Sequence, residues 1–509
     1  MQAATLVPAF PSLSPPPQSA SMPAARAMKA ASYLHRLLAA SLCAGAFCAI
    51  LGVSHFSFAA DASKPNVIFI MSDDQGSIDA GCYGAKDLVT PGMDRLAAQG
   101  VRFTQFYSAA PVCSPSRAGL LTGRYPWLAG MPNNGPEPPS EADDQLETLT
   151  GEGLPRTEAT LADMFRAAGY ATAHIGKWHL GSGAGHKPLD HGFDYSFGFM
   201  GGCIDNYTHF FYWEGPARHD LWENNRRVRL PGRYFPDLMI EKAEAFIDHH
   251  RDRPFFMYFA INMPHYPYQG EDKWLQYYKD KNVPYPRNLY AAFVSTLDER
   301  VQRLVKFLED SGLRERTIIV YQSDNGHSVE ERAHRGGGSS GPYRGAKFSL
   351  FEGGIRLPAI VSWPGHVAAG EVRGQVAHGC DWMPTLAELC GVSLPKRELN
   401  GRSLVPVLRS ADAPSPHDTL QWRLGQQWAV RQGPWKLLHR PNDEADAPAS
   451  KLAPADKEWF LANIDDDSGE RTNLASLHPE ILERLRKLEP AGRPPEKKAA
   501  AQKQKQASE

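Results

Sequence analysis

The chain has 509 residues, of which 42% are hydrophobic and 22% are charged, and its formal net charge is −2. A chain of this length and composition can form two or three domains with a large buried core. The near-neutral charge and the lack of a basic stripe give no reason to expect nucleic acid as a partner.

The first 60 residues predict an N-terminal extension and a signal peptide. Arg36 precedes the apolar run 37–53, and small residues near Ala59 offer a cleavage site. An uncleaved membrane anchor is the alternative, but the run is just under the length that spans a bilayer comfortably. We therefore expect an exported protein, in the periplasm, at the cell surface or outside the cell, without stable membrane insertion.

Removal of this signal leaves five cysteines, an odd number. Cys380 and Cys390 are one candidate disulfide in an oxidising compartment, which the sequence does not establish.

Short apolar runs alternate with helical patterns over much of the chain. Runs typical of buried parallel strands occupy 66–72, 171–175, 254–261, 317–323 and 358–363. Apolar periodicity indicates helices at 160–169, 238–250 and 291–312. This alternation predicts an α/β fold whose mostly parallel central sheet is covered by helices on both faces.

The pattern changes near residue 395, which we take as a domain boundary. A large α/β domain is expected at 61–395 and a smaller C-terminal α+β subdomain at 396–490. Its short, turn-rich segments predict a small antiparallel sheet closed by a helix at 479–489. The polar end of the chain, 491–509, predicts a disordered tail. The stretch 131–158, rich in proline, glycine and acids, indicates a surface insertion.

The segment CSPSRAGLLTGR, residues 113–124, begins with a cysteine at the mouth of a predicted helix. Ser114 can cap that helix, Pro115 fits its first turn, and Gly123 ends it. Cys113 then lies where unpaired backbone N–H groups favour an anion. Such a position suits a nucleophile or an anion-binding group better than a residue that packs in the core.

Polar side chains follow four of the predicted strands. Because ligands of open α/β sheets bind beyond the carboxyl ends of the strands, these side chains are expected to meet at one edge. Each alone is typical of a turn or a solvated loop, and it is their combination with the cysteine helix that indicates a site. They are Asp73 and Asp74, Lys177 and His179, His265, and Asp324 with Asn325.

The segment that begins at Cys113 resembles the Cys-x-Pro-Ser-Arg…Thr-Gly-Arg signature of the type I sulfatases, in the alkaline phosphatase superfamily. Further segments are similar to that family in the same order: PNVIFIMSDDQG, TPGMDRLAAQGVRFTQFY, GYATAHIGKWHLG, SDNG and RGAKFSLFEGGIRLP. The likeness runs from about residue 64 to 395, and IDDDSGERTNLA is a fainter match to the family's closing segment. The resemblance implies a sulfuric ester hydrolase of the arylsulfatase kind.

The resemblance also implies the chemistry of such an enzyme. A maturation enzyme would oxidise Cys113 to formylglycine, whose hydrate attacks the sulfur of a sulfate ester through one hydroxyl. Loss of a proton from the second hydroxyl then expels the sulfate and restores the aldehyde. A divalent cation would assist this attack; oxygen ligands favour calcium, with magnesium as the runner-up. The implied metal ligands are Asp73, Asp74, Asp324 and Asn325.

Basic side chains complete the implied site. By this resemblance Arg117 holds the aldehyde hydrate, Lys177 binds the sulfate, and His179 hydrogen-bonds the hydrate. His265 and Lys347 would flank the leaving oxygen. The ordinary pKa of histidine favours His265 as the acid, although the sequence leaves the choice open.

The implied substrate is a sulfated carbohydrate or an aryl sulfate. Two alternatives stay open: a phosphodiesterase or phosphonate monoester hydrolase of the same superfamily, and a non-catalytic sugar-binding protein on a decayed sulfatase frame. The first usually carries more histidines at its metal site than this chain offers. The second requires missing catalytic residues, and none of the expected ones is missing.

Overall fold

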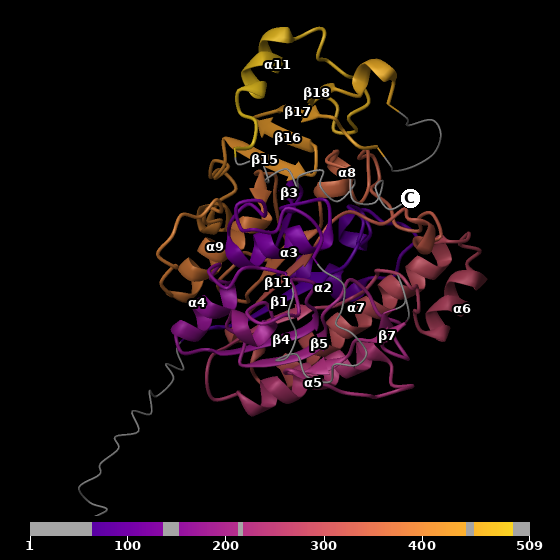
Figure 1. Ribbon diagram of the computed structural model, residues 1–509. Coiled ribbons are helices and arrows are strands. Elements are labelled where there is room, and N and C mark those ends of the chain that lie inside the picture. The colour runs from indigo at the N-terminus through magenta and orange to yellow at the C-terminus, as the bar shows by residue number, and fades with distance from the viewer. Residues whose placement is uncertain (1–63, 136–151, 212–216, 444–451, 492–509) are drawn as a thin grey trace, which may run out of the picture. The chain divides into compact units, whose positions relative to one another are not determined.

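The computed structural model of the protein describes residues 64–135, 152–211, 217–443 and 452–491, which all belong to one compact unit at residues 60–509 (Figure 1). The predicted extension and signal peptide at 1–60, nearly all of the predicted tail and most of the predicted insertion lie outside the described residues. No helix within the described ranges is long and apolar enough to cross a membrane.

A ten-stranded sheet forms the centre of this unit. β1 (Asn66–Ser72) lies between β10 (Phe255–Ala260) and β11 (Thr317–Ser323), and β4 (Ala171–Lys177) lies beyond β10; these neighbours pair parallel. Every residue of these four strands is buried. Strands buried on both faces carry continuous apolar runs, which is why the sequence could predict them. The expectation of a mostly parallel sheet is confirmed here.

The outer strands differ in direction from the central ones. β12 (Ala359–Ser362) pairs antiparallel with both β11 and β2 (Val101–Phe103), so the prediction of a parallel strand at 358–363 is wrong. A short, fully buried apolar run carries no signal of its direction. The strand order is β13–β2–β12–β11–β1–β10–β4–β5–β8–β9. The other strands of this sheet are β5 (Tyr195–Phe199), β8 (Trp222–Glu223), β9 (Arg226–Arg227) and β13 (Glu371–Arg373).

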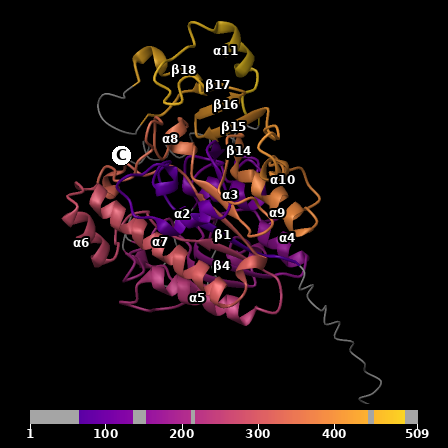
Figure 2. The same ribbon diagram turned by 180° about the vertical axis from the view of Figure 1, so that it is seen from behind.

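Helices cover both faces of the sheet, as the alternating pattern predicts. Phe69 of β1 belongs to a core with α3 (Cys113–Thr122), α4 (Leu161–Ala167) and α9 (Trp382–Cys390). Its neighbour Ile70 belongs to a second core with α2 (Pro91–Ala98), α5 (Phe235–His249) and α7 (Arg287–Asp310). Figure 1 shows α3, α4 and α9 on one side of the sheet, and Figure 2 shows α5 and α7 in front when the view is from behind.

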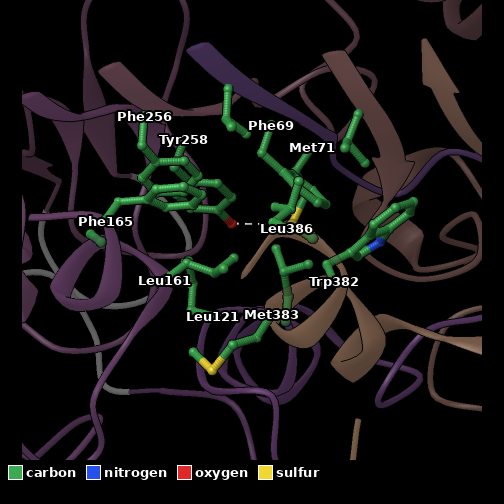
Figure 3. Close-up of a cluster of buried hydrophobic side chains, with 14 of the residues drawn as sticks. Phe69, Met71, Leu121, Leu161, Phe165, Phe256, Tyr258, Trp382, Met383 and Leu386 are labelled. Carbon is green, nitrogen blue, oxygen red and sulfur yellow. Dashed lines mark hydrogen bonds between the residues drawn. The ribbon is translucent and has the colours of Figure 1, made fainter. Parts of the chain in front are cut away.

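The first of these cores fixes α3 against the sheet (Figure 3). Leu121 of α3 is fully buried there, and the ring of Trp382 lies edge-on to Phe69 with centroids 5.9 Å apart. The hydroxyl of Tyr258 donates to the sulfur of Met71 at 3.1 Å. Because side chains from both the helix and β1 fill this core, the first residue of α3 has a defined position relative to the end of β1.

A second, smaller sheet follows the large one in the chain. It is an antiparallel meander of β15 (Thr419–Leu424), β16 (Gln427–Gln432), β17 (Trp435–His439) and β18 (Trp459–Asn463). α11 (Pro479–Arg486) packs on it through the buried Leu485. The predicted small sheet with its closing helix is therefore present, and the predicted boundary at residue 395 stays a prediction. The remaining elements include β3 (Phe106–Tyr107), β6 (Phe210–Phe211), β7 (Arg218–His219), β14 (Ala377–His378), α6 (Asp272–Asp280), α8 (Glu352–Ile355) and α10 (Val405–Arg409).

The five cysteines in the described ranges are all free thiols. Cys380 and Cys390 are both buried and are not joined, so the candidate disulfide is not formed.

Candidate active site

Four neighbouring strands end at one edge of the large sheet, and polar side chains meet there. The backbone N–H of Asp74 donates to Oδ1 of Asp324 at 3.1 Å, which joins the turn after β1 to the turn after β11. Lys177 is the last residue of β4 and not a loop residue as predicted, because β4 continues its pairing with β5 through this position. Its Nζ donates to both carboxylate oxygens of Asp73, at 2.8 and 3.0 Å. The predicted site residues are all buried: Asp73, Asp74, Cys113, Arg117, Lys177, His179, His265, Asp324, Asn325 and Lys347.

Cys113 is the first residue of α3. The residue before it, Val112, has an extended backbone and no side chain caps the helix, so the predicted capping by Ser114 is wrong. The hydroxyl of Ser114 instead accepts a hydrogen bond from the backbone N–H of Gly135 at 2.7 Å. Sγ of Cys113 lies 3.7 Å from Oδ1 of Asp73, and burial raises the pKa of the thiol. The cysteine therefore faces the first strand end as a protonated, poorly accessible thiol.

Arg117, one helical turn after Cys113, joins α3 to two strand ends. Its Nε and Nη2 donate to Oδ2 of Asp324 at 3.1 and 2.8 Å, and its Nη1 donates to the carbonyl of Lys177 at 3.1 Å. Nη2 also lies 3.6 Å from Oδ1 of Asp73. A fully buried guanidinium is tolerated only when it is paired and hydrogen-bonded, as this one is. Arg117 thus fixes the start of α3 relative to β4 and β11.

The two adjacent carboxyl groups after β1 differ in acidity. Burial raises the pKa of Asp73 to about 7, although Lys177 opposes this effect. Burial acts in the same direction on Asp74, but Lys347 and His265 outweigh it and hold the pKa of that carboxyl below its ordinary value. Of the two carboxyl groups, Asp73 is therefore the one whose ionised form a further positive charge would stabilise most.

His265 and Lys347 form a pair next to Asp74. Nδ1 of His265 donates to the carbonyl of Tyr266 at 2.7 Å, so Nε2 is the acceptor of the ring. Nζ of Lys347 lies 3.4 Å from that Nε2 and 2.9 Å from Oδ2 of Asp74. Burial lowers the pKa of His265 well below its ordinary value. Burial also acts to lower the pKa of Lys347, but Asp74 outweighs it and raises that pKa well above the ordinary value. The proton of the pair resides on Lys347.

His179 turns its ring into the same buried region. Its backbone is left-handed, with φ of 56°, and its ring packs against Gly202, where a Cβ would lie only 3.1 Å from Cε1. Burial, and after it the charge of Lys177, lower the pKa of the imidazole well below its ordinary value. Within the described part of the chain, Nδ1 has no hydrogen-bond partner. A buried ring nitrogen without a partner is costly, and it is available to hydrogen-bond a bound group.

Oxygen ligands for a cation gather at the end of β1. Ligand atoms of Asp73, Asp74, Cys113 and His265 all lie within 4.8 Å of one another. Asn325 donates from Nδ2 to Oδ1 of Asp74 at 2.7 Å, while its own Oδ1 is buried with no hydrogen-bond partner among the described residues. A hard cation would satisfy such an oxygen. These residues fit a divalent cation bound by oxygen, and the predicted set of four ligands stays a prediction.

Sequence reasoning misses Glu330 and Tyr266. Oε2 of Glu330 lies 3.4 Å from Nζ of Lys347 and accepts from the hydroxyl of Tyr266 at 3.2 Å. The ring of Tyr266 lies 5.8 Å from the same Nζ. Both residues are in loops without periodicity, and their closeness in sequence to His265 and to the DNG turn is the one signal that could have found them.

The chain is similar to known proteins over most of its length. A family model described as Sulfatase matches residues 65–392, and one described as N-sulphoglucosamine sulphohydrolase, C-terminal, matches residues 345–442. Arylsulfatase A of Bos taurus is 34% identical over 478 residues, which cover 84% of this chain and 88% of that protein. N-acetylgalactosamine-6-sulfatase of Rattus norvegicus is 35% identical over 361 residues, which cover 68% of this chain and 66% of that protein.

Solved structures show the same fold. The crystal structure of Ps i-CgsB in complex with k-i-k-neocarrahexaose is similar with a TM-score of 0.72 and 29% identity, covering 84% of this chain and 92% of that one. The fold, the buried cluster and these relatives lead to one conclusion: the chain belongs to the sulfatase family, the hydrolases of sulfuric esters.

Proposed function

We propose that this sulfatase removes sulfate from sulfated carbohydrates, with formylglycine at position 113 as the nucleophile and calcium as the divalent cation. The observation that carries the proposal is the meeting of Cys113, at the start of α3, with the carboxyl groups of Asp73 and Asp74. The carbohydrate part is supported by similarity to N-acetylgalactosamine-6-sulfatases and to a protein solved in complex with k-i-k-neocarrahexaose. Aryl sulfates are the expected artificial substrates.

The state of the thiol supports a modified residue at position 113. A buried thiol with a raised pKa carries little thiolate and is a weak nucleophile. The hydrate of formylglycine offers two hydroxyl groups, one for attack on sulfur and one for the elimination that restores the aldehyde. Arg117 lies one helical turn after position 113, where Asp324 holds its guanidinium, and it would orient this hydrate. The unpaired Nδ1 of His179 would accept or donate one further hydrogen bond to it.

Positive charge placed in advance would bind the sulfate group. Asp73, Asp74, Asp324 and Asn325 would hold the cation, which when bound supplies charge for the sulfate oxygens and lowers the pKa of an attacking hydroxyl. Lys177 is an additional cation at the same edge, because its Nζ contacts Asp73. Such fixed charges stabilise the transition state without reorganising during the reaction.

The His265–Lys347 pair would protonate the leaving oxygen. Its two nitrogen atoms are 3.4 Å apart, so a proton delivered from one can be replaced through the other. A bound sulfate group and a cation would shift both the raised pKa of Lys347 and the lowered pKa of His265, and the activities of variants of the two residues on sugar sulfates distinguish the acid.

Export and maturation are part of the proposal. The predicted signal peptide supports an exported enzyme, in the periplasm, at the cell surface or outside the cell, and Cys113 requires a maturation enzyme that generates formylglycine.

The test is a paired assay of activity and substrate class. Purified enzyme is given an aryl sulfate, an aryl phosphodiester, an aryl phosphonate monoester and a panel of defined sulfated oligosaccharides, and released sulfate or released aryl alcohol is measured. We expect sulfate release from the aryl sulfate and from at least one oligosaccharide, and none with Cys113→Ala. Preferential hydrolysis of the phosphodiester or the phosphonate monoester would instead support the phosphodiesterase or phosphonate monoester hydrolase, which the similarity to sulfatases disfavours. Activity on aryl sulfate without activity on any oligosaccharide would contradict the carbohydrate part alone.

A further inference from the structure

The loop 344–352, which carries Lys347, is held at both ends by the C-terminal sheet and the segments beside it. At its start, Nε of Arg344 donates to Oδ2 of Asp443 at 2.8 Å and Nη1 donates to the carbonyl of Glu470 at 3.1 Å. At its end, the backbone N–H of Glu352 donates to Oε2 of Glu470 at 2.5 Å. These contacts join residues more than 90 positions apart in the sequence.

A buried cluster of charges reinforces the end of this loop. Nζ of Lys436, on β17, lies 2.9 Å from Oε1 of Glu352 and 3.0 Å from Oε1 of Glu470. The side chains of all three residues are fully buried. Buried charges with defined partners tolerate little displacement, because any separation leaves a charge unpaired in the interior.

The middle of the loop is held at Phe348, the residue after Lys347. Its φ is 72°, a left-handed conformation that is costly for a residue with a bulky side chain. Its backbone N–H donates to the carbonyl of Pro111 at 2.9 Å, and its carbonyl accepts from Nε2 of Gln427 at 2.8 Å. Gln427 is the first residue of β16 and is nearly fully buried. The strained peptide is therefore held between the C-terminal sheet and the segment that leads into Cys113.

We propose that Gln427 is a positioning residue, which holds Lys347 at Asp74 and His265 by fixing the strained backbone of Phe348. The inference rests on the proposed role of Lys347 in the reaction. It makes the C-terminal sheet a working part of the active site, although Gln427 itself touches no reacting atom. Without the amide donor, Phe348 loses one of the two backbone hydrogen bonds that oppose its strain, and a shift of this backbone displaces Nζ of Lys347 relative to Asp74 and His265.

The variant that tests this is Gln427→Met, which keeps the length of the side chain and removes the donor. Lys436→Met is the more obvious change, but it leaves two buried glutamates without their cation and is expected to fold poorly. The matched control is Gln432→Met on the same strand, whose Nε2 donates to Thr419 on β15 at 3.3 Å and so bonds within the small sheet. Near-UV circular dichroism and melting temperature establish that each variant is folded.

We expect Gln427→Met to lower kcat by roughly tenfold to a hundredfold with little change in KM, because small misplacements of a reacting group cost rates of this order. Gln432→Met is expected to keep wild-type kcat. The decisive comparison uses Lys347→Ala as the background, where Gln427→Met is expected to cost less than about twofold further, since a positioning residue has nothing left to position.

Four results separate success from failure. Non-additive losses support the inference. If Gln427→Met lowers kcat by the same factor in wild type and in Lys347→Ala, the inference is overturned. The same holds if Gln427→Met has the kcat of Gln432→Met. Both results leave the role of Lys347 intact. If Lys347→Ala itself keeps wild-type kcat, the proposed role of Lys347 fails, and the inference fails with it.

Discussion

Glu470 makes a specific contribution to how stability depends on pH. It shares Lys436 with Glu352, and burial raises the pKa of Glu470 from its ordinary 4.5 to about 7. Between these two values the folded chain holds a proton on Glu470 that the unfolded chain has lost. The free energy of unfolding therefore falls as the pH rises from about 4.5 to about 7, and this contribution is constant above that range. At about 1.4 kcal/mol for each pH unit, the loss amounts to roughly 3 kcal/mol.

The variant Glu470→Gln keeps an acceptor for the backbone N–H of Glu352 and leaves Lys436 with a single carboxylate. The free energy of unfolding of both proteins is measured by urea titration at pH 5, 6, 7 and 8. We expect the variant to gain stability relative to wild type across this range, by about 3 kcal/mol in total. Glu331→Gln, at a highly exposed glutamate, is the control and is expected to show no such trend. A difference between Glu470→Gln and wild type that stays constant from pH 5 to pH 8 would show that the pKa of Glu470 is not raised in the folded chain.

Three further predictions concern the reaction. In active enzyme, mass spectrometry of the tryptic peptide that contains Cys113 is expected to show a loss of about 18 Da relative to the thiol, the difference that formylglycine makes; full activity with an unmodified thiol would contradict the mechanism. Strong chelation is expected to lower both activity and melting temperature, and calcium to restore them better than magnesium. If neither property changes and elemental analysis finds no metal, the assignment of the cation site is wrong. With substrate bound, His265 is expected to take its proton from Lys347 and act as the acid, so His265→Ala should impair sugar sulfates on the order of a hundredfold or more, and activated aryl sulfates far less, because a good leaving group needs little protonation. A shift of that ratio in Lys347→Ala but not in His265→Ala would identify Lys347 as the acid.

The central strands were predictable from sequence because burial on both faces leaves a clear apolar run, as in β1 and β11. The end of α3 was predictable as well, since Gly123 adopts the left-handed conformation that glycine favours, with φ of 67°. The direction of β12 was not, because a run of four buried residues has the same composition in either direction. The predicted start of α3 was two residues too late, since the helix is capped at Val112 and the hydroxyl of Ser114 bonds to a distant loop.

The members of the candidate site came from residue types, from their order along the chain and from family resemblance. Their electrostatic states did not, because burial decides them and burial depends on the whole fold. His265 was expected to titrate near neutrality, yet its pKa is lowered well below the ordinary value in the interior. The proposed support of Lys347 by Gln427 could not be predicted either. Gln427 bonds to the carbonyl of Phe348, 79 positions away, and no sequence pattern indicates the strained backbone of that residue.

The positions of the paired strands along the chain also determine how long β1 waits for its partner β11 during synthesis. β1 leaves the ribosome early, but β11, which pairs with it along its whole length, follows only about 250 residues later. About 230 residues separate Cys113 from Lys347. At about 5 to 20 residues per second, their synthesis takes roughly 10 to 50 seconds. During that interval the cysteine cannot yet be enclosed, whereas in the finished fold it is almost wholly buried. The proposed maturation enzyme would therefore reach Cys113 on the growing or still unfolded chain, before β11 pairs with β1.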